Sequence, residues 1–80
     1  MTREEILQGL NEVFQEVFAD EGIAITESTG SEDIDEWDSL SQIELIMAIE
    51  AQYSMKFSID EAQGIHTVGD MIDIIEKKID

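Results

Sequence analysis

Four segments of this chain open with a signal for the start of an α-helix. In each, a Ser or Thr is followed three residues later by Glu, Gln or Asp. This is the capping-box pattern, in which the two side chains satisfy backbone N–H groups that lack a partner in the first turn of a helix. The four boxes are Thr2-x-x-Glu5, Ser39-x-x-Gln42, Ser58-x-x-Glu61 and Thr67-x-x-Asp70. The sequence therefore predicts an all-α fold with four helices.

The first helix and the long connection after it are distinguished by their periodicity. From residue 20 to residue 37 no helical spacing is present, and Gly22 and Gly30 lie among Ser, Thr and acidic residues, which is typical of a loop. A loop this long in a small domain usually has a function. Three isoleucines are expected to anchor it: Ile23, Ile25 and Ile34. The first helix is predicted from the apolar stripe Ile6, Leu7, Leu10, Val13, Phe14, Val17 and Phe18.

The other helices are predicted from about residue 39 to about 53, from 58 to near 64, and from 67 onward. Either Asp38 or Ser39 can cap the second helix. The fourth carries the stripe Val68, Met71, Ile72, Ile75 and Ile79. We therefore expect a small four-helix bundle, with three longer helices, one short helix and a long loop between the first two. Residues 1–80 are expected to form one domain.

The charge of the chain limits its partners. Against 20 Asp and Glu there are only 4 Lys and Arg, a net charge of −16, which repels nucleic acid and anionic lipid and attracts basic protein surfaces. No stretch approaches the length of a membrane span, and no signal peptide is recognisable. We expect a cytoplasmic monomer that does not insert into membranes. Because the chain has no Cys, any thiol chemistry requires an added group.

The tripeptide Asp38-Ser39-Leu40 places a serine at the exposed start of the second helix. Its hydroxyl has no evident activating base, since His66 is the only histidine and no Ser-His-Asp set can be built around it. A domain of 80 residues is also normally too small for an enclosed active site. We therefore expect no catalytic residues and no enzyme activity, and we interpret Ser39 as a residue that another enzyme modifies.

Two segments, 38–50 (DSLSQIELIMAIE) and 65–70 (IHTVGD), resemble acyl carrier proteins, and the similarity covers essentially the whole chain. The resemblance implies that Ser39 accepts 4′-phosphopantetheine from coenzyme A through a separate magnesium-dependent phosphopantetheinyl transferase. It further implies that Asp38 lies close to the metal of that transferase, with no metal site in the chain itself. Leu40, Glu44 and Met47 match positions that partner enzymes recognise.

The second helix carries more apolar residues than a core needs, because Leu40 and Met47 share a face with Glu44. One interpretation is that Leu40 and Met47 belong to the core. The other is that this mixed face docks onto enzymes that offer a groove and basic residues, such as acyl-loading, condensing and transferase enzymes. The serine at the start of the helix favours docking. The same charge density predicts that salt or divalent cations stabilise the fold.

The chain departs from the common fatty-acid carrier at Glu36-Trp37, before the tripeptide, and at Ser41, after it. Trp37 is expected either to close the acidic loop onto the bundle or to offer a contact surface for the arm or a partner. These differences favour a specialised stand-alone carrier, in fatty acid, polyketide or a related pathway. Peptidyl and D-alanyl carriers are the alternatives within the family.

Parts of the sequence are also compatible with two other classes of protein. Asp33, Asp35 and Asp38, with Glu44 at the twelfth position, are reminiscent of a calcium-binding loop, but Trp37 replaces an oxygen ligand and Asp38 occupies the place of the required Gly. The second class is an acidic interaction domain in which Ser39 is only a helix cap. A covalent adduct at Ser39 is expected from a carrier alone.

Overall fold

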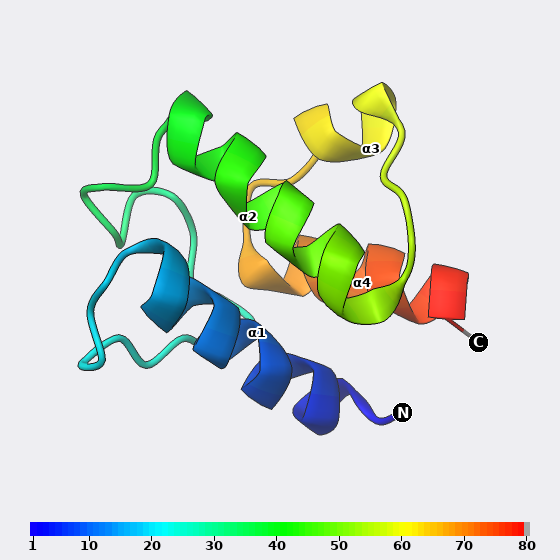
Figure 1. Ribbon diagram of the computed structural model, residues 1–80, viewed down its shortest axis with the longest axis horizontal. Coiled ribbons are helices and arrows are strands. Elements are labelled where there is room, and N and C mark those ends of the chain that lie inside the picture. Colours follow the sequence, from blue (N-terminus) through cyan, green and yellow to red (C-terminus); the bar gives the residue numbers. More distant parts are fainter. Residues whose placement is uncertain (80) are drawn as a thin grey trace.

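The computed structural model describes residues 1–79 and contains four α-helices, as the sequence predicts (Figure 1). Their bounds are α1 Arg3–Val17, α2 Ser39–Tyr53, α3 Ile59–Gln63 and α4 Val68–Ile79. Helix α1 packs against both α2 and α4, while the short α3 lies beside α2 at the upper right of Figure 1. Among these described helices, none combines the length and the hydrophobicity needed to cross a bilayer.

The predicted capping boxes form at α1, α3 and α4. Thr2 Oγ1 accepts a hydrogen bond from the backbone N–H of Glu5, and the Glu5 carboxylate accepts one from the backbone N–H of Thr2. The same reciprocal pair joins Thr67 and Asp70 at the start of α4. At α2 the box is displaced by one residue, because Asp38 is the cap.

Three helices supply most of the buried core. Helix α3 has no buried residue, so it covers one edge of the bundle instead of filling it. The loop anchor Ile25 is buried, whereas Ile23 and Ile34 pack against the core from its edge. The fully buried side chains are Ile6, Leu10 and Phe14 from α1, Leu45 and Ile49 from α2, and Val68, Met71, Ile72 and Ile75 from α4.

The long loop between α1 and α2 is fixed to the start of α4 by backbone hydrogen bonds. The N–H of Val68 donates to the carbonyl of Thr29, and the N–H of Gly69 donates to the carbonyl of Glu27, both at 2.8 Å. A Cβ at Gly69 would lie 3.0 Å from the Glu27 carbonyl oxygen, so this close approach favours glycine. The loop carbonyls thus satisfy N–H groups that α4 cannot pair within itself.

Arg3 connects three parts of the fold through ion pairs. Its guanidinium contacts Glu27 of the loop at 2.5 Å, and Asp73 and Glu76 of α4 at 2.7 and 2.6 Å. These hydrogen bonds raise the pKa of Arg3 above its ordinary value, and the bond to Glu27 has the largest effect. The same bond lowers the pKa of Glu27. One of only four cationic side chains in the sequence therefore neutralises part of the repulsion between α4 and the loop.

We predict that Arg3→Gln lowers the melting temperature more than Lys56→Gln, which makes the same change in net charge away from these three carboxylates. Because salt screens both the ion pairs and the general repulsion, the difference between the variants should shrink as ionic strength rises, while the wild-type melting temperature increases. Thermal denaturation followed by circular dichroism at several salt and magnesium concentrations measures both effects. Equal melting temperatures for the two variants at low salt would contradict a specific role of Arg3.

Candidate functional site

Asp38 caps helix α2 and determines where the helix begins. One of its carboxylate oxygens accepts hydrogen bonds from the N–H groups of Leu40, at 3.1 Å, and Ser41, at 3.0 Å. The Ser41 hydroxyl accepts from the N–H of Asp38 and donates to the carbonyl of Glu36, both at 2.8 Å. The hydrogen bond from the Ser41 backbone is the main cause that lowers the pKa of Asp38 below its ordinary value. The cap is therefore ionised at neutral pH.

Ser39 is the first residue of α2 and is exposed. Since Asp38 and Ser41 form the capping box, the Ser39 hydroxyl lies outside it. A serine in this position presents its oxygen at the corner where the loop meets the helix. Of the two candidates, Asp38 is therefore the cap of the helix. Ser39 remains accessible to a modifying reagent.

Two carboxylates of the calcium-loop pattern, those of Asp33 and Asp38, have hydrogen-bond partners within the chain. Asp33 accepts a hydrogen bond from the N–H of Gly30 at 2.8 Å, and Asp38 is occupied by the α2 cap. Within residues 1–79 no three His, Asp or Glu side chains are placed to hold a metal ion. The local geometry therefore favours a turn and a helix cap over a cation-binding loop.

Trp37 closes the loop onto the bundle. Only 6% of the residue is exposed, and its ring meets that of Phe14 edge-on, with centroids 5.1 Å apart and an interplanar angle of 83°. Its indole Nε1–H donates to Oε1 of Gln42 at 2.5 Å. Of the two roles open for Trp37, this burial supports closing the loop onto the bundle. Trp37 also lines a groove, so the second role stays open.

This groove, of about 820 Å³, opens between α2 and α3 beside Ser39. Its wall is mainly apolar along α2 and α3 and polar near Ser39. Ile43 and Ile46 lie four and seven residues after Ser39, so the helical spacing already places them on the face of the serine. Sequence reasoning missed the groove because it depends on where α3 packs. The residues around it are Ser31, Trp37, Asp38, Ser39, Gln42, Ile43, Ile46, Ile59, Ala62, Gln63 and Ile65.

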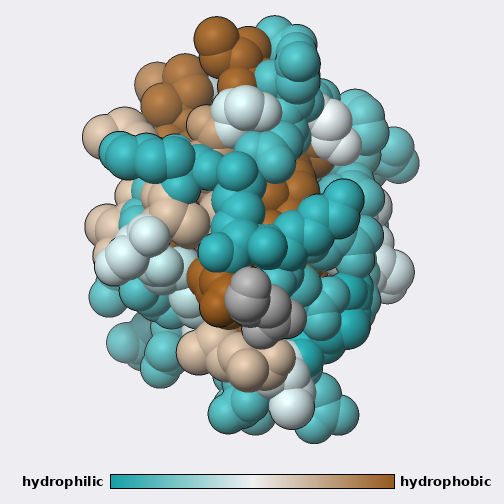
Figure 2. Space-filling model, turned by 90° about the vertical axis from the view of Figure 1, so that its right-hand side faces the viewer, coloured by the Kyte–Doolittle hydropathy of each residue, from teal (hydrophilic) through white to brown (hydrophobic). Residues whose placement is uncertain are grey.

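The predicted docking residues lie outside the core. Leu40 and Met47 are 68% and 64% exposed, and Glu44, between them on the same face, is also exposed. The interpretation of Leu40 and Met47 as core residues is therefore wrong. Exposed apolar surface continues onto α3, where Ile59 is 77% exposed. Figure 2 shows a hydrophobic area at the upper end of the molecule, with smaller hydrophobic areas at the centre and in the lower half of that face among hydrophilic residues.

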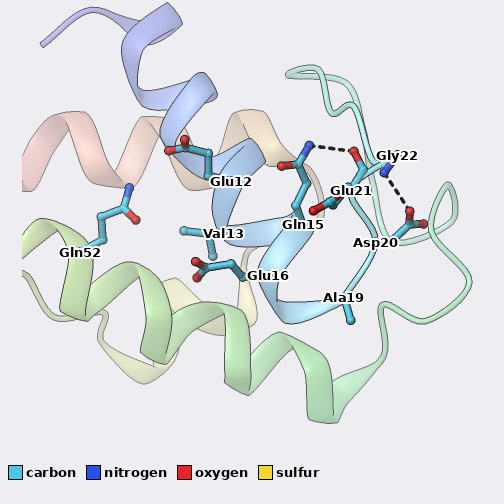
Figure 3. A pocket seen from close by; sticks show the side chains of 9 residues that line it. All are labelled: Glu12, Val13, Gln15, Glu16, Ala19, Asp20, Glu21, Gly22 and Gln52. Carbon is cyan, nitrogen blue, oxygen red and sulfur yellow. Dashed lines mark hydrogen bonds between the residues drawn. The ribbon is translucent and has the colours of Figure 1, made fainter.

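A second hollow, of about 890 Å³, lies along the second half of α1 and the turn that follows (Figure 3). Its wall includes four carboxylates, from Glu12, Glu16, Asp20 and Glu21. Gln15 stabilises the turn beside it by donating to the carbonyl of Glu21 at 3.2 Å. With no exposed serine on its wall, this hollow lacks the combination of nucleophile and apolar surface found beside Ser39.

Comparison with known proteins decides the family. The family model described as "Phosphopantetheine attachment site" matches residues 8–75. The chain belongs to the acyl carrier proteins. It is a carrier, and the group on which it carries cargo is a covalently attached 4′-phosphopantetheine.

Individual acyl carrier proteins are similar over most of the chain. The meromycolate extension acyl carrier protein of Mycobacterium leprae is 35% identical over 96% of this chain and 67% of its own length. An acyl carrier protein of Acidothermus cellulolyticus is 37% identical over 94% of this chain and 89% of its own. The solution structure of holo acyl carrier protein from Geobacter metallireducens superposes with a TM-score of 0.85 at 42% identity, covering 91% of this chain and 84% of that one.

We predict that Asp38→Asn lowers the melting temperature at pH 7, by up to about 5 °C, whereas Asp35→Asn does not. Both variants remove one exposed carboxylate, but that of Asp38 accepts hydrogen bonds from the backbone of α2, and these lower its pKa on folding. Such a group stabilises the fold above its unfolded pKa, near 3.8, and this contribution is lost as pH falls through the lower pKa of the folded state. The melting temperatures of the wild type and of Asp38→Asn, measured from pH 7 downward, should therefore converge once the pH is below the folded pKa of Asp38. Curves that stay apart by a constant amount at all pH values would contradict the ionised cap.

Proposed function

We propose that Ser39 is the residue of this acyl carrier that bears the 4′-phosphopantetheine arm. The single observation that carries the proposal is that the exposed serine lies outside the α2 cap and at the mouth of an apolar groove. The Ser39 oxygen would form a bond to the phosphorus that carries pantetheine in coenzyme A. The phosphoanhydride bond breaks, adenosine 3′,5′-bisphosphate leaves, and the hydroxyl proton passes to a base of the transferase.

The start of α2 suits a phosphate ester. Ser39 is the first residue of a helix of 15 residues, and the positive end of the helix dipole favours the negative charge of a phosphate. The carboxylate of Asp38 adjoins the serine, where it can approach the Mg²⁺ that the transferase holds against the phosphates of coenzyme A. We propose that Asp38 serves both as the helix cap and as part of the recognition site.

The bound arm supplies a terminal thiol that holds acyl groups as thioesters, which this chain without cysteine cannot do by itself. The chain's own residues supply the surroundings. Ile43, Ile46 and Ile59 offer apolar surface beside Ser39, and the amides of Gln42 and Gln63 offer polar partners. The groove is therefore suited to shelter the part of an acyl chain that lies next to the helix.

We propose that the partner enzymes dock on the face formed by Leu40, Glu44 and Met47. Two exposed apolar side chains with a carboxylate between them fit a shallow groove bordered by basic residues. Contacts of this kind are weak and sensitive to salt, as a carrier that visits several enzymes requires. The phosphopantetheinyl transferase, acyl-loading enzymes and condensing enzymes are the expected partners.

We propose that the cargo is a fatty acyl group or a related specialised intermediate, since several similar proteins are named for meromycolate extension. Residues 1–80 would act as one non-enzymatic domain and as a monomer, because a net charge of −16 opposes self-association. We place it in the cytoplasm, where coenzyme A is available to the transferase.

Incubation with coenzyme A, magnesium and a broad-specificity phosphopantetheinyl transferase should increase the intact mass of the unmodified protein by one phosphopantetheine. Ser39→Ala should show no increase, and Ser31→Ala, which changes another exposed serine beside the groove and leaves the Asp38–Ser41 cap intact, should still accept the group. Mass spectrometry of the three proteins measures the result. A wild-type protein that is folded, initially unmodified and unchanged in mass would refute the proposal for that transferase, and modification of Ser39→Ala would move the site elsewhere.

The docking face can be tested with matched changes of charge. Glu44→Lys should raise the KM of the transferase for the carrier about tenfold at low salt, because it places like charge against a basic surface. Glu12→Lys makes the same change at an exposed position of α1, away from this face, and should have a much smaller effect on KM. Steady-state kinetics at low and high salt distinguish the two. Equal increases for both variants would show that net charge alone guides docking.

A further inference from the structure

Trp37 separates the groove beside Ser39 from the interior of the bundle. Trp37 lines the groove, and its indole meets the ring of Phe14, which is fully buried. Trp37 and Ile65 are the two buried apolar residues of the wall, and Trp37 is the larger. If the indole were absent, the groove would open toward Phe14 and the core.

A hydrogen bond keeps the indole in this place. Nε1 donates to the side-chain amide of Gln42, which lies on α2 one turn after Ser39 and also borders the groove. A saturated acyl chain offers no acceptor to the indole N–H. If an acyl chain displaced Trp37 from Gln42, the indole N–H would lose its hydrogen-bond partner, which is costly for a buried residue. The edge-on contact with Phe14 would be lost as well.

We propose that Trp37 is the residue that limits how much of an acyl chain this carrier shelters. The inference rests on the proposed function, since it requires an arm on Ser39. A short acyl segment lies in the groove against Ile43, Ile46 and Ile59, and the indole stops longer chains from entering the bundle. From Ser39 to Ile46 the groove follows α2 for about 10 Å, so the sheltered segment is short.

The test uses the holo-protein loaded with saturated acyl groups of short, medium and long chain, after mass spectrometry has verified each product. The half-life of the thioester toward hydroxylamine reports shelter. In the wild type this half-life should increase with chain length among the short acyl groups and then stay constant for longer ones. In Trp37→Ala it should continue to lengthen with the chain, because each further methylene buried favours the sheltered state about fourfold. Phe18→Ala is the matched control, since Phe18 packs against Phe14 but does not border the groove.

A second measurement needs no variant, because Trp37 is the only tryptophan. Its emission should shift when the first short acyl group is attached and change no further with longer chains. A wild-type half-life that lengthens without limit, a folded Trp37→Ala with the wild-type pattern, or emission identical in holo and acylated protein would each overturn the inference. Absence of any mass increase at Ser39 would instead refute the proposed function, and this inference with it.

Discussion

The capping of α2 by Asp38 is the interaction on which the candidate site depends. Because the carboxylate binds the N–H groups of Leu40 and Ser41, the helix begins at Ser39, at the corner where the loop meets the bundle. The burial of Leu45 and Ile49 in the core sets the rotation of the helix and leaves Leu40, Glu44 and Met47 on the outside. The cap therefore places the serine, and the buried face of α2 places the exposed face that follows it.

The fold tolerates its negative net charge because few carboxylates take part in its internal packing. The core is built mainly from apolar side chains of three helices, completed by Ile25, Trp37, Met55 and Ile65 from the connecting segments, and the loop is held on α4 by backbone groups. Arg3 lies where the loop, α1 and α4 meet, so a single cation pairs with three carboxylates there. Most other acidic side chains lie on the surface. They are then available to attract basic partners without being required for packing.

The helices were predictable because the signals that define them are local. A capping box acts within four residues, and the apolar stripes of α1 and α4 repeat within one helix. The choice between Asp38 and Ser39 as cap was not predictable, since both residue types accept the same hydrogen bonds. The groove was not predictable either, because α3 contributes Ile59 and Ala62 from a distant part of the chain. For Trp37 the sequence left two roles open, and the indole has both a buried and a groove-facing side.

The position of Trp37 connects stability with cargo. If an acyl chain could pass from the serine into the core of a carrier, it would replace contacts between core side chains. The stability of such a carrier would then depend on its cargo. Here the indole is held by Phe14 on one side and Gln42 on the other, so entry of a chain would break contacts that also hold the loop on the bundle. The free energy of those contacts opposes deep entry. Under the proposed limit, cargo that stays in the groove would leave those contacts intact. A folded state that is insensitive to cargo would then present the same proposed docking face to each enzyme in turn.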